Sequence, residues 1–318
     1  MHILVFGKDG QLGKAFKGLF DSIDLASHNI TVQFVGRSDC NLLQIASLSN
    51  LLNQAKPNLI INAAAYTAVD KAEAEVEVAY AVNAKAPEIM AQYAADHGAT
   101  FLHFSSDFVF DGNKSGFYIE EDLRDPLGIY GKSKVAGEMA IEKVFANVPA
   151  GQYAIFRTSW VYGAGGNFIK TILRLAKERD SLSIIEDQVG VPTSADWLAA
   201  VSLDLIFDRH CHLQKIPSGI YHAVPSGETN WHGLACLAVQ SAIEAGASLQ
   251  IDPGLIKPIL AIEYPLPAPR PMNSRMASDK LREAIASQGD VSKLPRWKQS
   301  WREQVQAYVH QLVKDRFI

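Results

Sequence analysis

Short apolar runs alternate with longer helical patterns along the first half of the chain. The apolar runs are rich in Ile, Val, Leu and Phe, as expected of strands that are buried on both faces. They cover residues 2–6, 31–35, 59–62, 100–104 and 153–157. Strands that alternate with helices are typical of a parallel sheet with helices on both faces. The pattern therefore predicts an α/β fold with a doubly wound parallel sheet.

The alternation becomes less regular in the second half of the chain. From residue 163 onward the strand and helix patterns are short, and a proline-rich stretch at 265–271 precedes a final helical region. This change predicts a smaller C-terminal α+β substrate domain. We expect residues 1–160 to form a dinucleotide-binding domain and residues 161–318 to be mainly substrate-binding, with some segments returning to pack on the first domain.

Three glycines follow the first predicted strand directly. Gly7, Gly10 and Gly13 form G-x-x-G-x-x-G and lead into a helical pattern. Glycines allow a pyrophosphate to approach backbone amides at the positive end of a helix. The motif therefore predicts a Rossmann-type dinucleotide site, and the alternative interpretation is a glycine turn that serves packing alone.

The end of the second predicted strand bears on the choice of cofactor. It reads Gly36-Arg37-Ser38, where an NAD site usually has an acidic residue for the ribose hydroxyls. The sequence thus predicts no carboxylate here. Arg37 is suited instead to the 2′-phosphate of NADPH, so we predict NADPH as the cofactor, with NADH as the alternative. The other interpretation makes Arg37 a solvated turn residue.

Small side chains follow the third predicted strand. They are Ala63, Ala64 and Ala65, with Tyr66 next in the chain. In open α/β sheets ligands bind at the carboxyl edge of the strands, and small residues there let a cofactor lie close.

Candidate catalytic residues lie between residues 103 and 134. A hydroxyl at Ser105 or Ser106 ends the fourth predicted strand, and Tyr130 and Lys134 stand four apart, on one face of a predicted helix. A phenol has a pKa near ~10, and a nearby ammonium group favours its ionised form. Together these groups can bind a carbonyl oxygen and give it a proton while a hydride reaches the carbon.

Composition limits the other classes of function. The net charge is −4 and no dense Lys/Arg run exists, so nothing favours nucleic acid or a membrane surface as a partner. No apolar stretch approaches the ~20 residues that span a bilayer, and we expect a cytoplasmic protein with three reduced cysteines. His210-Cys211-His212 lacks a second ligand pair at zinc spacing, so we expect no metal site.

Seven motifs carry a resemblance to a known family. The chain resembles the dTDP-4-dehydrorhamnose reductases, which are extended short-chain dehydrogenases/reductases, over nearly its whole length. The motifs are GKDGQLG, NAAAYTAVDKAE, HFSSDFVFDG, YGKSKVAGE, FRTSWVYG, DQVGVPT and RPMNS, in the order of the family. The resemblance implies NAD(P)H-dependent reduction of the 4-keto group of a dTDP-sugar, dTDP-4-dehydro-β-L-rhamnose, to dTDP-L-rhamnose.

The resemblance also implies roles for individual residues. Tyr130 would be the proton donor, Lys134 its electrostatic partner and Ser106 the hydroxyl, often threonine in the family. The implied cofactor contacts are Gly10, Gln11 and Leu12 at the pyrophosphate, Asn41 and Leu42 near the adenine, and Ala63, Ala64, Ala65 and Lys134 at the nicotinamide half. The implied substrate contacts are Trp160, Val69, Asp107, Arg270 and Asn273.

Three positions depart from the family pattern. Asn41-Leu42 replaces an Asp followed by an apolar residue near the adenine, and Phe108 replaces a tyrosine. The family allows a homodimer, but Lys14 stands where some members carry a glutamate associated with a magnesium-bridged dimer, which argues against that bridge.

Two alternatives stay open. The first is another sugar-nucleotide reductase or epimerase of the same fold. A 4,6-dehydratase of that fold usually has Asp-Glu after the hydroxyl residue, and Asp107-Phe108 here argues against that reaction. The second alternative is a non-catalytic regulatory subunit similar to the β subunit of methionine adenosyltransferase.

Overall fold

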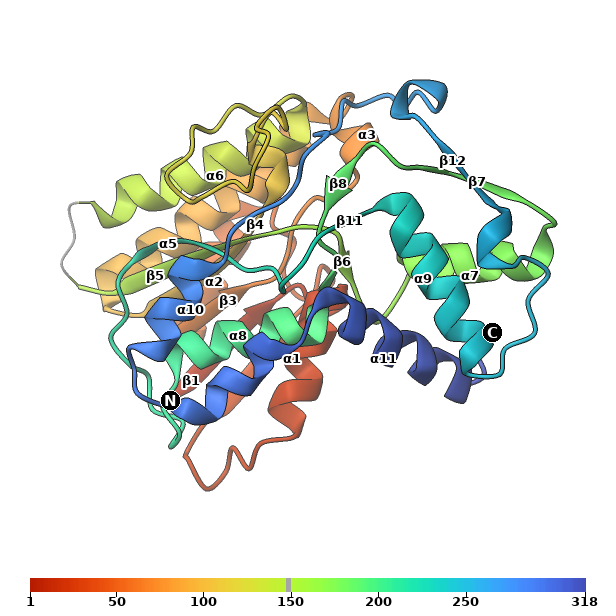
Figure 1. Cartoon of the computed structure of the whole chain (residues 1–318). Coiled ribbons are helices and arrows are strands. Elements are labelled where there is room, and N and C mark those ends of the chain that lie inside the picture. The colour runs from red at the N-terminus through yellow and green to blue at the C-terminus, as the bar shows by residue number, and fades with distance from the viewer. Residues whose placement is uncertain (147–149) are drawn as a thin grey trace.

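A six-stranded parallel sheet forms the centre of the protein (Figure 1). The computed structural model describes residues 1–146 and 150–318. In spatial order the strands are β2 (Thr31–Val35), β1 (His2–Phe6), β3 (Leu59–Asn62), β4 (Thr100–Ser106), β5 (Gln152–Thr158) and β10 (Gly219–His222). All neighbours are parallel. The predicted α/β fold is therefore confirmed, and the sixth strand comes from the second half of the chain.

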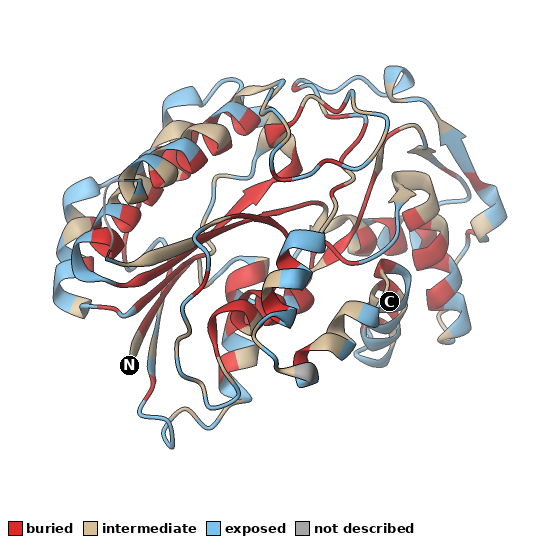
Figure 2. Ribbon diagram, turned by 60° about the vertical axis from the view of Figure 1, so that its left-hand side comes forward, coloured by how far each residue is buried: buried red, intermediate tan, exposed pale blue. Residues whose placement is uncertain are grey.

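Helices cover both faces of this sheet, and Figure 2 shows its strands buried between them. One layer contains α1 (Gln11–Asp21), α8 (Ala195–Ile206) and α10 (Asp279–Ala286), and the other contains α2 (Ile45–Ala55), α5 (Ala86–His97) and α6 (Ile129–Phe145). Side chains of β1 alternate between the two layers, with Ile3 and Val5 in one core and Leu4 and Phe6 in the other. This alternation follows from the two-residue period of a strand.

The order of the strands creates a crevice beside β1. The chain passes from β1 to β2 on one side and then crosses to β3 on the other side. The connections that leave the carboxyl ends of β1 and β3 therefore diverge. In doubly wound sheets this switch point is where ligands bind.

A second lobe, at the right of Figure 1, is built from later segments. Its core lies among α7 (Phe168–Glu178), α9 (Trp231–Glu244) and α11 (Trp301–Lys314). Three strand pairs complete it: β7 (Leu182–Ile185) with β12 (Ile256–Ile259), β6 (Val161–Tyr162) with β9 (Thr193–Ser194), and β8 (Val189–Gly190) with β11 (Thr229–Asn230). No helix in the described part of the chain is long and apolar enough to cross a bilayer.

The helical pattern expected at 72–95 is broken into several pieces. They are α3 (Val69–Ala72), α4 (Val76–Tyr80), a π-helical turn at Ala81–Lys85 and α5. Pro87 has no N–H to donate to the Asn83 carbonyl, and the Ala86 N–H bonds five residues back to Ala81. Pro87 was the expected interruption of the helical pattern at 72–95, and the structure adds the π-helical turn before it.

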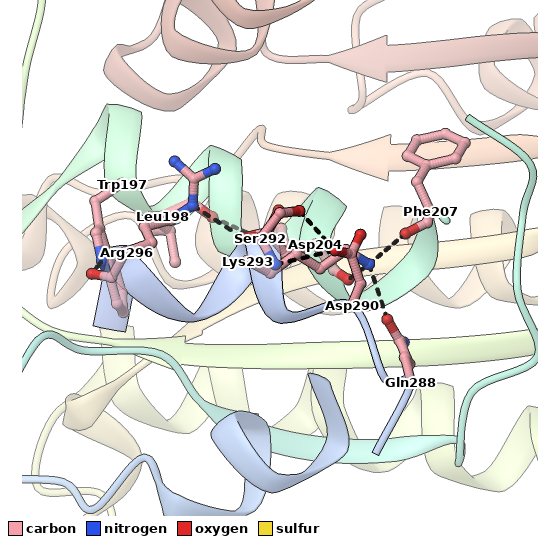
Figure 3. A network of polar contacts seen from close by, with 10 residues as sticks. Trp197, Leu198, Asp204, Phe207, Gln288, Asp290, Ser292, Lys293 and Arg296 are labelled. Atoms are coloured by element: carbon pink, nitrogen blue, oxygen red, sulfur yellow. Dashed lines mark hydrogen bonds and ion pairs between the residues drawn. The ribbon is translucent and has the colours of Figure 1, made fainter. Parts of the chain in front are cut away.

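The C-terminal end of α8 is closed by a later segment, the 3₁₀ helix Val291–Lys298 (Figure 3). The last carbonyls of a helix have no partner within the helix. Lys293 Nζ donates to the carbonyls of Asp204 (2.8 Å) and Phe207 (2.6 Å), and Arg296 Nε donates to the Asp204 carboxylate (2.8 Å). These contacts fasten the end of α8 to a segment that lies almost a hundred positions later in the chain.

Candidate active site

A cleft of about 1490 Å³ lies between the sheet and the second lobe. Most of the residues predicted for the site line it. They are Gly7, Gly10, Gln11, Leu12, Arg37, Asn41, Leu42, Ala63, Ala64, Ala65, Tyr66, Val69, Ser106, Asp107, Tyr130, Lys134, Trp160 and Arg270. Gly13 and Asn273 are not part of the lining. The fold thus brings residues from the whole length of the chain to one surface.

The glycine turn leaves backbone amides open to the cleft. Gly7 has φ +88°, and an added Cβ there would lie 2.7 Å from the Ala63 carbonyl carbon. Gly10 is the N-cap of α1 and provides no side-chain cap, so the first N–H groups of this helix are free for an anion. A dinucleotide pyrophosphate fits this arrangement.

Ser106, Tyr130 and Lys134 form one buried wall of the cleft. Ser106 is the last residue of β4, and the other two lie one turn apart on α6. The Ser106 hydroxyl donates to Asp107 Oδ1 (2.8 Å) and accepts from the Phe108 N–H (3.2 Å). The ring of Phe108 meets the Tyr130 ring edge-on, with centroids 5.3 Å apart. These contacts fix the hydroxyl and the phenol on the same side of the cleft.

The electrostatics of this wall differ from the expectation that Lys134 favours an ionised phenol. Burial raises the pKa of Tyr130 to about 12, although the nearby Ser106 hydroxyl acts in the opposite direction. Burial also lowers the pKa of Lys134 to about 8. The cost of burying a charge therefore outweighs any attraction between the two groups, and Tyr130 holds its proton at neutral pH.

Asn62 and His103 support Lys134 from the neighbouring strands, and the sequence analysis missed both. The Ala64 N–H donates to Asn62 Oδ1 (3.2 Å), so the amide nitrogen of Asn62 donates to His103 Nδ1 (3.1 Å). His103 Nε2 lies 3.3 Å from Lys134 Nζ. Lys134 also donates to the Phe104 carbonyl (2.6 Å). Polar residues within the apolar strands β3 and β4 were the available signal.

Arg270 reaches the cleft from the proline-rich stretch, which crosses from the second lobe to α3. Its guanidinium donates to both oxygens of Asp70, at 2.9 and 2.8 Å. The Ala268 N–H also donates to Asp70 Oδ1 (3.1 Å). Asp70 was not predicted, and its pairing with Arg270 makes the arginine a link between the two lobes.

Asn273 stabilises a loop near the cleft. Its amide nitrogen donates to the carbonyls of Lys114 (2.6 Å) and Gly116 (2.8 Å). The side chain is therefore occupied by the protein itself, which differs from the substrate contact that the resemblance implies.

Trp160 forms an aromatic wall on the second-lobe side. It has φ +47° and stacks on Trp231, with ring centroids 3.8 Å apart. Phe168 packs against Trp231 at 4.7 Å. Trp231 and Phe168 were not predicted, because no local pattern links them to residue 160.

The turn after β2 corrects one expectation. No carboxylate was predicted at this end of the strand, yet Asp39 Oδ2 accepts the Gly36 N–H (2.8 Å). The turn folds back because the N–H groups of Asp39 and Cys40 both donate to the Gly36 carbonyl. The carboxylate was missed because it comes three residues after the glycine and returns only through the turn.

Comparison with known proteins agrees with the resemblance. The family model described as RmlD substrate binding domain matches residues 1–313. The chain is 40% identical over 291 residues to the dTDP-4-dehydrorhamnose reductase of Escherichia coli K12, covering 90% of this chain and 92% of that protein.

Solved structures give the same result. The dTDP-4-dehydrorhamnose reductase of Clostridium acetobutylicum superposes with a TM-score of 0.83 at 31% identity, covering 98% of this chain and all of that one. The reductase of Bacillus anthracis, solved in complex with NADP, gives 0.80 at 28% identity, covering 98% and 99%. The chain therefore belongs to the RmlD family, the family of dTDP-4-dehydrorhamnose reductases.

Proposed function

We propose that the protein reduces the 4-keto group of dTDP-4-dehydro-β-L-rhamnose to dTDP-L-rhamnose, with NADPH as the preferred cofactor and NADH as a possible one. The observation that carries this proposal is the buried wall of Ser106, Tyr130 and Lys134 in the cleft that the glycine turn also enters. The relatives, which are dTDP-4-dehydrorhamnose reductases, support the same substrate.

The cofactor half of the cleft suits a dinucleotide. The glycine turn and the open N-terminus of α1 would hold the pyrophosphate, and Ala63 and Ala64 leave room for a flat ring beside β3. When bound, the reduced nicotinamide supplies the hydride. The structure of the Bacillus anthracis relative with NADP supports this assignment.

The chain's own residues handle the oxygen of the keto group. Tyr130 is the proton donor, and its raised pKa keeps the proton in place until the oxygen becomes basic. Ser106 would turn its hydroxyl proton from Asp107 to the keto oxygen, because a hydroxyl has a single proton to donate. Lys134 would stabilise the tyrosinate as it forms, because an ammonium group lowers the energy of a nearby anion.

The sugar nucleotide would lie on the second-lobe side of the cleft. The Trp160 and Trp231 stack gives this side a flat aromatic wall, while Asp107 and Val69 line the floor next to the catalytic wall. We propose that the segments after residue 160 supply most of this surface. Strand β10 and helices α8 and α10 are exceptions, because they pack with the sheet.

Phe108 favours reduction over dehydration. A dehydratase needs an acid to expel the 6-hydroxyl group, and here an apolar ring lies against Tyr130 at that position. An epimerase would instead recycle its cofactor without net consumption.

The test is to add dTDP-4-dehydro-β-L-rhamnose and NADPH to the purified protein and to follow NADPH absorbance and product together. We expect one NADPH oxidised per dTDP-L-rhamnose formed. An epimerised keto sugar formed without net oxidation of NADPH would indicate an epimerase. Binding of NADPH without turnover of any keto sugar would favour a regulatory subunit.

A further inference from the structure

Trp160, on the second-lobe side of the cleft, is held in a strained backbone conformation. Its φ of +47° lies in the left-handed region, which a bulky residue adopts only where the surrounding structure holds it. The backbone is tied down next to the ring: Ser159 Oγ donates to the Val191 carbonyl (2.7 Å), and the Thr193 N–H donates to the Trp160 carbonyl (3.3 Å). Trp160 therefore keeps this conformation because its neighbours offset the strain.

The indole ring of Trp160 lies between two later segments of the chain. Trp231 stacks on one face, with ring centroids 3.8 Å apart and an angle of 18° between the planes. A Cβ added to Gly190 would lie 2.7 Å from both Cε2 and Cζ2 of Trp160, and its next neighbour would be Ser274 Cβ at 3.2 Å. An atom placed so close to the stacked face would meet Trp231 as well. Gly190 and Trp231 therefore cover opposite faces of the ring.

We call Gly190 and Trp231 the indole slot. Strands β8 and β11 bring the two residues together, because Gly190 pairs with Thr229, two positions before Trp231. Trp231 is the first residue of α9, and the N-cap Asn230 accepts a hydrogen bond from the first turn of this helix (2.7 Å). Phe168 of α7 also packs on Trp231, with centroids 4.7 Å apart. Both walls of the slot are thus built on paired or capped elements.

The slot leaves part of Trp160 available to a ligand. Trp160 and Trp231 line the cleft, whereas Gly190 does not. In the described part of the chain the Trp160 indole N–H has no hydrogen-bond partner, and it is not among the polar groups that the protein encloses. This donor is therefore free for a ligand, in an orientation that the slot sets.

We propose that Trp231 and Gly190 are positioning residues, which hold the Trp160 ring in the orientation that binds the sugar of the dTDP-sugar. This inference rests on the proposed function, because it takes Trp160 as a substrate contact. Holding a side chain in its bound orientation raises affinity, because no ordering cost remains to be met on binding. Without the slot, the strained backbone at Trp160 relaxes and the ring leaves this orientation.

The experiment compares the wild type with Trp231→Leu, Trp231→Phe, Gly190→Ala, Trp160→Leu and the double variant Trp160→Leu/Trp231→Leu. Calorimetry gives the Kd of dTDP-L-rhamnose for the NADPH-loaded protein, which cannot react, and the Kd of NADPH alone. Steady-state kinetics with dTDP-4-dehydro-β-L-rhamnose give KM and kcat. Trp297→Leu is the matched control, because Trp297 belongs to another tryptophan pair, with Trp197 at 5.2 Å, and does not line the cleft.

Loss of the stack should weaken binding of the sugar nucleotide. Trp231→Leu should raise its Kd and KM about tenfold, which corresponds to about 1.4 kcal/mol and is the size expected of an aromatic pair. We expect kcat to stay within about threefold and the Kd of NADPH within about twofold, because the slot acts on sugar binding. Gly190→Ala should act in the same direction, since its methyl group displaces the ring. Trp231→Phe should keep most of the affinity, and Trp297→Leu should change nothing.

The double variant separates positioning from direct contact. If Trp231 acts through Trp160, adding Trp231→Leu to Trp160→Leu should not raise the Kd of dTDP-L-rhamnose further. Additive losses, or an unchanged Kd in both Trp231→Leu and Gly190→Ala, would overturn the assignment while the proposed function stands. If the wild type neither binds dTDP-L-rhamnose nor reduces the keto sugar, the proposed function fails together with this assignment.

Discussion

Tyr130 combines two properties that are difficult to provide together. Its phenol is buried, which keeps it protonated, yet in the proposed reaction it must release that proton to the substrate. Ser106 and Lys134 lie on the same wall, so the negative charge left on the phenol would form next to a hydroxyl and an amine. A proton donor of this kind works only because the charge that it acquires is stabilised locally.

Tyr130→Phe should lower kcat by about 10²- to 10⁴-fold, because it removes a positioned proton donor and keeps the ring. The Kd of the dinucleotide should stay unchanged. Tyr153→Phe is the control, since Tyr153 packs on Phe145 outside the cleft lining. A kcat of Tyr130→Phe near that of the wild type would contradict the assignment of Tyr130 as the proton donor.

Asp107 is predicted to make stability depend on pH. Burial raises its pKa from 3.8 to about 6, so the folded state holds this proton more tightly than the unfolded state does. Ionisation of buried Asp107 lowers the free energy of unfolding. This loss is absent below about pH 3.8, grows as the pH rises and is complete above about pH 6.

Asp107→Asn should therefore raise the free energy of unfolding by about 1–3 kcal/mol at pH 8 and by less at pH 5. Denaturant unfolding at the two pH values measures this difference. A gain that is equal at both values, or larger at pH 5, would contradict the assignment of a buried, ionised carboxylate.

At the scale of elements, the position of α6 depends on the π-helical turn before α5. An added Cβ at Gly137 would lie against the Asn83 carbonyl oxygen, closer than van der Waals contact allows. The Asn83 side chain donates to Ser133 Oγ (3.0 Å) and to the Tyr66 carbonyl (3.0 Å). Asn83, in the π-helical turn, thus links α6, which carries Tyr130 and Lys134, to Tyr66 in the cleft lining.

Gly137→Ala should destabilise the protein by about 1–3 kcal/mol, because the added methyl group forces the two helices apart. Gly18→Ala is the matched control: it lies in α1 with nothing within 4 Å of an added Cβ, and it should stabilise by about 0.5–1 kcal/mol. Thermal unfolding of both variants checks this, and equal signs would contradict the packing argument.

The sequence predicted the elements whose signal is local. Five strands of the sheet contain short runs rich in apolar residues, and all five were located. The sixth strand, β10, was not assigned to the sheet, because its four residues carry no information about their partner. The break at 81–85 depends on Pro87 and on the close approach of Gly137 to Asn83. Pro87 can be read from the local sequence, whereas the approach of Gly137 depends on how two helices pack.

The same distinction applies to the site. Gly7, Tyr130 and Lys134 belong to short motifs and could be predicted. Asp39 and Asp70 could not be predicted. Asp39 meets Gly36 only through the turn after β2. The partner of Asp70 is Arg270, which lies two hundred residues later in the proline-rich stretch.

At the scale of the molecule, the cleft exists only because the two lobes face each other. The Asp70–Arg270 pair and the aromatic wall of Trp160 and Trp231 bring later segments to the carboxyl edge of the sheet. Ligands that contact both sides should therefore stabilise the whole fold.

NADPH at about 100 times its Kd should add about 2.7 kcal/mol to the free energy of unfolding, because only the folded state binds it. For a protein of this size the increase corresponds to a rise in Tm of about 4 °C. Thermal unfolding with and without NADPH measures it. No change in Tm at saturating NADPH would contradict the assignment of the cleft.

In the proposed reaction, hydride reaches C4 of the sugar while Tyr130 protonates its oxygen. A direct test uses NADPH with deuterium in both positions at C4 of the nicotinamide, with dTDP-4-dehydro-β-L-rhamnose as acceptor and NMR of the product. We predict one deuterium at C4 of dTDP-L-rhamnose per NADPH oxidised. Product without deuterium at C4, or no oxidation with the cofactor bound, would contradict the account.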